Sequence, residues 1–313
     1  MSQPLEPSKL NEIIRKVTMI VIEIVTLIVS ILVIYIKSLI HLIVGKPEKN
    51  VSGQVAVVTG AGHGLGKQLS LQLSRKGVKV ALIDINQFGI DSVKDEIMMT
   101  GGQAFAYKCD VTNESMVKQV METIKSDLGP VDILINNAGI THCTPFVDLS
   151  PGQIRKTFEV NTLSHFWTIS AVLTEMIERD QGHIVAISSI AGLLGTPNVV
   201  EYCSSKFAVN GLMTALEKEM HIGGANANVH FTTVCPLIMN TGMFKRPKTR
   251  FSSLLPICSP EDVASTIIKS MLQNDSLITV PQSAMAIYRL EKIVPEEAAK
   301  KVQDWLDYGV GSH

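Results

Sequence analysis

The chain has 313 residues and a formal net charge of −1, with 46% hydrophobic and 18% charged residues. This length fits one large α/β domain plus an appendage. The near-neutral charge argues against a global basic field, so no nucleic-acid partner is expected. The five cysteines, an odd and scattered set without a CxxC pair, indicate neither a disulfide framework nor a metal site: Cys109, Cys143, Cys203, Cys235 and Cys258. Reduced thiols of this kind suit a domain that faces the cytosol.

After a polar head at residues 1–16, residues 17–44 predict a membrane anchor. Val17–Ile36 is almost unbroken aliphatic sequence, and about twenty such residues can span a hydrocarbon core as a helix. A signal peptide is disfavoured because the run is long and no small-x-small cleavage site follows it. A buried soluble helix is disfavoured because the segment has no polar stripe.

The topology of this anchor stays open at the level of sequence. Glu23 in mid-span would cost roughly 2–3 kcal/mol if it stayed charged at depth. Basic residues lie on both sides of the segment, so the positive-inside rule does not assign an orientation. Lys37 and His41 interrupt the second half, and a re-entrant hairpin is therefore as compatible with the pattern as a single crossing.

Residues 45–53 are interpreted as a linker, residues 54–282 as one domain, and residues 283–313 as a C-terminal helical extension. Short, almost wholly apolar runs predict buried parallel strands at Val55–Thr59, Val80–Asp84, Ala104–Tyr107, Ile133–Asn136, Ile184–Ser188, Val229–Val234 and Leu277–Val280. Amphipathic stretches between them predict helices at Leu65–Lys76, Gly89–Met99, Glu114–Leu128, Gly152–Arg179, Tyr202–Met220 and Pro260–Gln273. The alternation predicts an α/β, Rossmann-type doubly wound parallel sheet with right-handed crossovers.

A glycine-rich loop follows the first predicted strand. The run Thr59-Gly-Ala-Gly-His-Gly-Leu-Gly66 leads into a helix. Its candidate cofactor contacts are Gly60, His63, Gly64, Leu65 and Gly66. Glycines here let the backbone turn tightly and approach a pyrophosphate at the helix N-terminus. A glycine loop alone is a weak signal, but its place between strand and helix predicts dinucleotide binding.

Asp84, at the end of the second predicted strand, indicates which dinucleotide is bound. A carboxylate there accepts hydrogen bonds from the adenosine ribose hydroxyls and repels a 2′-phosphate. Just before Gly64 stands His63 rather than Arg or Lys. The sequence therefore favours NAD over NADP.

Four motifs in this order resemble the short-chain dehydrogenase/reductase family: the glycine loop, Asn136-Asn137-Ala138-Gly139, Ser189, and Tyr202-x-x-x-Lys206. The resemblance covers about residues 50–282. Finer features resemble the subgroup that holds the type 11 and 13 17β-hydroxysteroid dehydrogenases and the epidermal retinol dehydrogenases. They are the hydrophobic N-terminus, Tyr202-Cys-Ser-Ser-Lys206-Phe207 and Cys235-Pro236. One departure is Leu237, where much of the family has glycine.

Tyr202 and Lys206 stand at i and i+4, so both project from one helix face. A lysine ammonium beside the phenol favours the phenolate, so Tyr202 is expected to take the alcohol proton as hydride leaves the carbon. Ser189 is placed to orient the substrate oxygen. The resemblance implies that Lys206 also holds the nicotinamide ribose, and that Asn161 holds a water that relays protons.

Further cofactor contacts are implied by the resemblance alone. Asp110 matches the position that contacts adenine. Asn137, Ala138 and Gly139 match positions beside the adenosine ribose, although the Asn-Asn pair can equally serve to brace the sheet. Thr241 matches the hydroxyl that meets the nicotinamide carboxamide.

The leading hypothesis is NAD-dependent oxidation of a lipophilic alcohol: a steroid, a retinoid or a related lipid. An NADPH-dependent lipid ketone reductase is the enzymatic alternative, and a lipid-droplet surface protein with a mainly interaction role is the non-enzymatic one. The resemblance also leads us to expect a homodimer on the endoplasmic reticulum membrane, on lipid droplets, or on both.

Overall fold

The computed structural model describes residues 7–222, 228–240, 242–244, 247–248, 250–251, 256–306 and 309–310, and the chain divides into two compact units, Met1–Glu48 and Lys49–His313. The first unit holds one helix, α1 (Pro7–Val44), of 38 residues. Within its segment Ser8–His41, an 18-residue window has a mean hydropathy of 2.9 and no buried residue, so the helix is long and apolar enough to cross a membrane.

Helix α1 is continuous and satisfies three of its hydroxyl groups internally. The hydroxyls of Thr18, Thr26 and Ser30 each donate to the carbonyl four residues earlier, at 2.8 Å. Such bonding removes the cost of placing a hydroxyl in an apolar surrounding. Between Pro7 and Val44 the helix is uninterrupted, so this part of the chain contains no turn of the kind that a hairpin requires.

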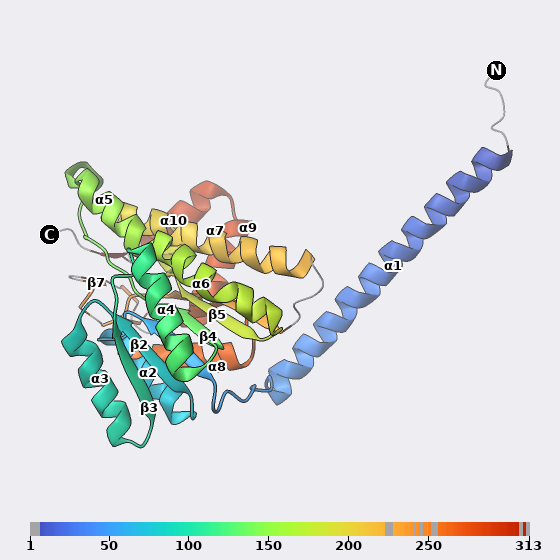
Figure 1. Cartoon of the computed structure of the whole chain (residues 1–313). Helices are drawn as coiled ribbons and strands as arrows, with labels where there is room; N and C mark the ends of the chain where they lie inside the picture. Colours follow the sequence, from blue (N-terminus) through green and yellow to red (C-terminus); the bar gives the residue numbers. More distant parts are fainter. Residues whose placement is uncertain are drawn as a thin grey trace. The chain divides into compact units, whose positions relative to one another are not determined.

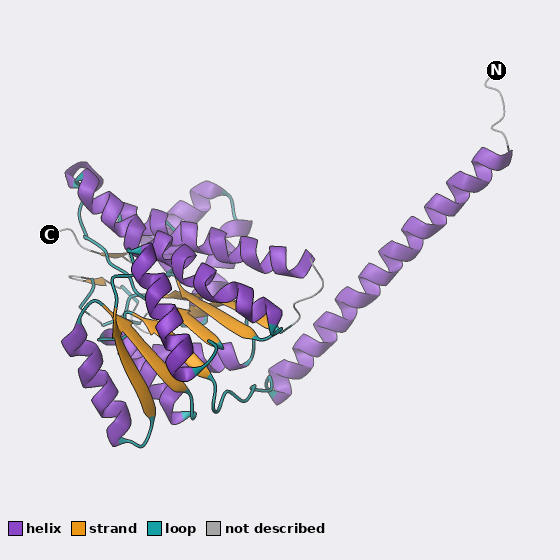
Figure 2. Ribbon diagram, viewed as in Figure 1, coloured by secondary structure: helices purple, strands orange, loops and turns teal. Residues whose placement is uncertain are grey.

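The second unit is built on a seven-stranded sheet, in the order β3-β2-β1-β4-β5-β6-β8. Its strands are β1 (Val55–Thr59), β2 (Lys79–Asp84), β3 (Gln103–Lys108), β4 (Ile133–Asn136), β5 (Gly182–Ile187), β6 (Val229–Pro236) and β8 (Leu277–Val280). All six pairings are parallel. The predicted doubly wound sheet is confirmed, and Figure 2 shows it sandwiched between helices.

Helices cover both faces of the sheet (Figure 1). One face carries α2 (Gly64–Arg75), α3 (Gln87–Met99) and α8 (Pro260–Leu272), and the other carries α4 (Glu114–Leu128), α6 (Ser164–Glu178) and α7 (Val200–Ile222). Strand side chains alternate between the two cores: Ala56 and Val58 pack into the first, Val55 and Val57 into the second. Because both faces of the central strands β1 and β4 are buried, these strands are almost wholly apolar, whereas the edge strand β3 carries exposed polar residues.

The predicted helix Gly152–Arg179 differs from the structure in its middle. It consists of α5 (Pro151–Phe158), a π-helical turn η2 (Glu159–Leu163) and α6. A single widened turn leaves the apolar periodicity almost intact, so the sequence pattern could not reveal it. Such turns occur often at functional sites, and this one contains Asn161.

The remaining elements lie around the carboxyl edge of the sheet and at the C-terminal end of the chain. They are the short turns η1 (Phe146–Asp148) and η3 (Ile190–Gly192), the paired β7 (Pro247–Lys248) and β9 (Gly309–Val310), and the helices α9 (Ser283–Ile293) and α10 (Glu296–Leu306). Ala284 of α9 and Leu306 of α10 are buried in a small core with Ile190 and Leu237. The C-terminal helices therefore pack against the segments that follow β5 and β6.

Candidate active site

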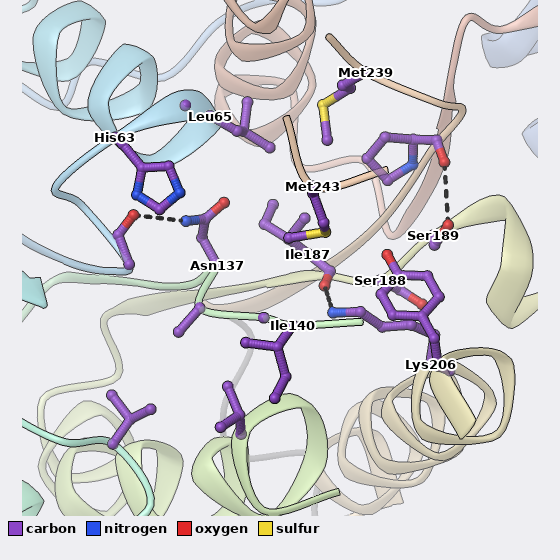
Figure 3. A pocket seen from close by; sticks show the side chains of 18 of the residues that line it. His63, Leu65, Asn137, Ile140, Ile187, Ser188, Ser189, Lys206, Met239 and Met243 are labelled. Atoms are coloured by element: carbon purple, nitrogen blue, oxygen red, sulfur yellow. Dashed lines mark hydrogen bonds between the residues drawn. The ribbon is translucent and has the colours of Figure 1, made fainter. Parts of the chain in front are cut away.

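The residues singled out in the sequence converge at the carboxyl edge of the sheet. Most of them line one cavity of about 310 Å³, whereas Gly66 and Asn161 are not part of its lining. In Figure 3, His63 and Leu65 lie at one end of this cavity and Ser189 and Lys206 at the other, with Asn137 towards the first end. An elongated site across the carboxyl ends of parallel strands is the usual place for a ligand in a doubly wound fold.

The glycine loop requires glycine at two positions. Gly60 has a φ of +65°, and a Cβ there would lie 2.9 Å from the Cα of Ala138. A Cβ on Gly66 would lie 2.1 Å from the carbonyl oxygen of Gly60. The loop can therefore close against the start of α2 only without side chains, which leaves its backbone open to a ligand.

Asp84 is fixed in place by the loops around it. Its Oδ2 accepts from the backbone N–H of Gly62 at 3.0 Å, and its Oδ1 from that of Asn86 at 2.9 Å. The side chain lines the cavity. Each carboxylate oxygen has a second lone pair, so Asp84 can still accept hydrogen bonds from a ligand's hydroxyls.

Asn137 braces the sheet as well as lining the cavity. Its Nδ2 donates to the carbonyls of Thr59 and Gly60 at 2.9 and 3.2 Å, and its N–H donates to Thr59 Oγ1 at 3.0 Å. This tie holds the ends of β1 and β4 together beneath the glycine loop. Ala138 and Gly139 continue the cavity wall.

Asp110 is also held by its own loop. Its Oδ1 accepts from the N–H and hydroxyl of Thr112 at 3.0 and 2.7 Å. Burial acts to raise the pKa of Asp110, but these hydrogen bonds and the charge of Lys156 leave it below its ordinary value. The ionised side chain of Asp110 therefore lines the cavity, as does Asp84, just after the end of β3.

At the other end, Ser189, Tyr202 and Lys206 form a buried cluster. The Ser189 hydroxyl accepts from the N–H of Ala191 at 3.1 Å and lies close enough to Tyr202 to act on the pKa of its phenol. The Nζ of Lys206 lies 5.7 Å from the centre of the Tyr202 ring and donates to the carbonyl of Ile187 at 2.7 Å. Phe244 packs edge-on against Tyr202, with ring centres 5.5 Å apart. The phenol is therefore fixed between a hydroxyl and an ammonium.

Burial decides the charge states in this cluster. It raises the pKa of Tyr202, an effect opposed by the neighbouring hydroxyl of Ser189. It lowers the pKa of Lys206 from 10.5 to about 8. At neutral pH the pair is consequently a neutral phenol beside a lysine that is still mostly an ammonium.

Asn161 lies in the π-helical turn, where its amide is almost fully used. Its Oδ1 accepts from Ile140 N–H at 2.8 Å, and its Nδ2 donates to the Ile140 carbonyl and to Ser205 Oγ at 2.9 and 3.0 Å. One lone pair of Oδ1 remains for a water. A Cβ placed on Gly139 would lie 3.5 Å from Asn161 Oδ1 and 3.6 Å from Lys206 Nζ, so all three meet at one point of the site.

Several residues of the site were missed in the sequence. Ser205 binds Asn161, while the buried Glu201 accepts the N–H of His142 at 3.0 Å. His165 is 1% exposed, and neither ring nitrogen has a hydrogen-bond partner within the described residues. The only signal for His165 is its place one helical turn after Asn161.

The donor set fits a dinucleotide. The glycine cradle suits a pyrophosphate, Asp84 suits a diol, and the buried hydroxyls and ammonium suit a ribose and a reacting oxygen. Thr241, expected at the carboxamide end, lies outside the described residues.

Comparison with known proteins agrees with this geometry. A family model described as short chain dehydrogenase matches residues 54–250. The chain is 35% identical to 17-beta-hydroxysteroid dehydrogenase 13 of Homo sapiens over 280 residues, covering 90% of this chain and 92% of the relative. It is 36% identical to estradiol 17-beta-dehydrogenase 11 of Mus musculus over 275 residues, covering 88% and 91%.

Solved structures share the architecture. A metagenomic short-chain oxidoreductase in complex with NADP has a TM-score of 0.62 and 26% identity, covering 74% of this chain and 97% of that one. A short chain dehydrogenase/reductase from Burkholderia phymatum in complex with NAD has a TM-score of 0.70 at 21% identity, covering 85% and 99%. At 21% identity the second likeness concerns the fold alone.

Proposed function

Because the chain belongs to the short-chain dehydrogenase family, we propose that it transfers hydride between NAD and a lipophilic alcohol or its carbonyl product, with Tyr202 as acid and base. Family membership makes it an NAD(P)-dependent oxidoreductase that acts on CH–OH groups. The observation that carries the proposal is the Tyr202 phenol, which lies beside Lys206 and shares with Ser189 the cavity that the glycine loop lines.

In the oxidative direction, Tyr202 takes the proton of the substrate hydroxyl as the carbon loses hydride. The oxidised nicotinamide supplies the hydride acceptor when it is bound. Ser189 donates a hydrogen bond to the substrate oxygen, which orients it towards Tyr202. In the reductive direction the same phenol returns the proton to the carbonyl oxygen.

Lys206 and Asn161 support the phenol. The ammonium of Lys206 stabilises the phenolate, and the carbonyl of Ile187 takes one of its three donors at 2.7 Å. Its remaining donors can reach a ribose hydroxyl or a water. Asn161 fixes the loop at Ile140 through two hydrogen bonds, of 2.8 and 2.9 Å. Its free lone pair is available to a water that passes the proton onward.

The cofactor preference is attributed to Asp84. Its carboxylate is anchored by two backbone N–H groups, so it cannot readily swing away from a 2′-phosphate. NADP would bring a phosphate against this fixed negative charge. NAD is the preferred cofactor, and an NADPH-dependent ketone reductase is the alternative that this geometry disfavours.

A lipophilic substrate and a membrane location are proposed together. Helix α1 presents its aliphatic side chains outward, and an enzyme held at a membrane has ready access to lipid-dissolved alcohols. Steroids, retinoids and related lipids are the substrate classes, and the endoplasmic reticulum membrane and lipid droplets are the locations. The catalytic domain faces the cytosol, where its free cysteines stay reduced.

A homodimer is also part of the proposal. Four large apolar side chains are exposed along the adjoining segments η2, α6 and α7: Leu163 at 41%, Phe166 at 43%, Val200 at 38% and Phe207 at 47%. An apolar surface of this kind favours association. Light scattering of the detergent-solubilised chain should give the mass of a dimer, and a purely monomeric mass would contradict this part.

The proposal is tested by turnover of the purified chain with NAD and with NADP against a panel of steroids, retinoids and fatty alcohols. Oxidation of at least one class with NAD, and a higher kcat/KM with NAD than with NADP, is the expected result. A strong NADP preference in the wild-type chain would contradict the cofactor assignment.

A further inference from the structure

A second cavity, of about 510 Å³, lies between α9, α10 and residues 190–197. Its size is within the range of small-molecule sites. Its walls come from two helices that Figure 1 shows near the C-terminal end of the chain. None of the residues in the proposed mechanism lines it.

The walls of this cavity are mainly apolar and partly exposed to solvent. Leu290 on α9, and Val302 and Trp305 on α10, line it while remaining 54%, 40% and 55% exposed. Two amphipathic helices that packed fully against each other would bury such side chains. Here they surround open space instead, and an apolar ligand that displaced the water would be favoured.

The polar side chains that line the cavity restrict the charge that the ligand's head group can carry. Among the described residues that line the cavity, the polar side chains are Thr196, Glu291 and Asp304, and none is basic. Carboxylates repel an anionic head but accept a hydrogen bond from a hydroxyl. The charge of the lining therefore favours an uncharged head over a fatty-acid carboxylate.

The cavity adjoins the catalytic one at Leu237. Leu237 lines both cavities and is only 4% exposed, and its N–H donates to the carbonyl of Val280 at 2.8 Å. This bond holds the backbone of Leu237 in register with β8. We propose that the second cavity is a separate binding site for a long alkyl chain with an uncharged hydroxyl-bearing head.

Trp305 offers a direct reporter of occupancy. The chain has two tryptophans, and the other, Trp167, packs against the core of the sheet. In a Trp167→Phe background, the full chain is placed in lipid nanodiscs without NAD and titrated with dodecanol brominated on its last two carbons. Bromine quenches the fluorescence of a tryptophan that it contacts. Saturable quenching of Trp305 is expected, with the matching brominated dodecanoate binding at least ten-fold more weakly.

Two substitutions on α9 distinguish binding in the cavity from contact of the alcohol with the bilayer. Leu290→Glu places a charge in the lining and should weaken quenching by the alcohol at least ten-fold. Ile293→Glu, on the same helix but 82% exposed and outside the lining, should leave it unchanged. Equal effects of the two, or quenching that never saturates, would show contact with the membrane only and overturn the proposal.

A second pair guards against a folding artefact. Ala298→Phe fills the cavity, whereas Ala286→Phe adds the same ring to an exposed position outside the lining. Only the first should weaken binding of the brominated alcohol. Undiminished binding in Ala298→Phe would overturn the proposal. Both variants should retain NAD binding, because neither position lines the catalytic cavity.

Discussion

The ammonium nitrogen of Lys206 lies 5.7 Å from the centre of the Tyr202 ring, one helical turn earlier on α7. Both side chains are almost completely buried, at 2% and 5% exposure. Burial disfavours both the Tyr202 phenolate and the Lys206 ammonium. Each of these charged forms is therefore stabilised by the opposite charge of its close neighbour. This pairing makes the proposed proton transfer dependent on pH.

Alcohol oxidation should accelerate as pH rises. Burial raises the pKa of Tyr202, so the phenolate is the minor form at neutral pH and its fraction grows up to about ten-fold per pH unit. Lys206, whose pKa is about 8, supports the phenolate as an ammonium below that pH. We expect kcat/KM for oxidation to increase between pH 6 and 8, and Lys206→Met to lower it throughout. A pH-independent rate over this range would contradict the role of Tyr202 as base.

Replacing Asp84 should relax the cofactor preference. Asp84→Ala removes both the hydrogen bonds to the ribose and the repulsion of a 2′-phosphate, so the NAD/NADP ratio of kcat/KM should fall at least ten-fold, about 1.4 kcal/mol. It also removes the acceptor for the N–H groups of Gly62 and Asn86. Asp84→Asn keeps an acceptor oxygen but loses the charge, and should therefore fall between the wild-type chain and Asp84→Ala. An unchanged ratio in both variants would show that another group discriminates.

His165 should make the fold sensitive to acid. Burial and the charge of Lys206 lower the pKa of His165 to about 3 from 6.5. Between these pH values the unfolded chain binds a proton that the folded chain does not, so stability falls as pH falls from 6.5 towards 3. One such group contributes about 1.4 kcal/mol per pH unit to this slope. In urea unfolding of the solubilised chain, His165→Leu should flatten the slope by about that amount, and an unaltered slope would contradict the burial of a neutral imidazole.

The anchor should act without the rest of the chain. Residues 17–44 fused to a soluble reporter are expected to carry it to endoplasmic reticulum membranes, and to lipid droplets when these are abundant. About twenty aliphatic residues, each contributing roughly 1.5–3 kcal/mol when buried, outweigh one glutamate. Ile28→Arg with Leu32→Arg should abolish targeting. In intact microsomes carrying the full chain, protease should digest the catalytic domain, and protection until detergent is added would contradict its cytosolic placement.

The sequence predicted what depends on local pattern. The bounds of β1, β4 and β8 were predicted to the residue, because short apolar runs between turn residues leave little choice. The glycine loop could be assigned because only glycine permits the contact between Gly66 and Gly60. These features are determined by residues that are close together in the sequence.

What escaped prediction depends on contacts between distant segments. The π-helical turn is accompanied by hydrogen bonds from Asn161 to Ile140 and Ser205, which no periodicity records. The backbone carbonyl of Ile187 that holds Lys206 carries no sequence signature. The sequence predicted a C-terminal helical extension at residues 283–313, but not the cavity between α9 and α10. Such relationships are set by how the chain closes in three dimensions.

The most direct test of the central claim is Tyr202→Phe, which removes one hydroxyl and keeps the ring against Phe244. The purified variant and the wild-type chain are compared for NAD binding by titration, and for turnover of a panel of steroids, retinoids and fatty alcohols. Our account predicts that turnover falls on the order of 10²–10⁴-fold, while the Kd for NAD changes less than about three-fold. Near-normal turnover of those substrates by Tyr202→Phe would contradict it.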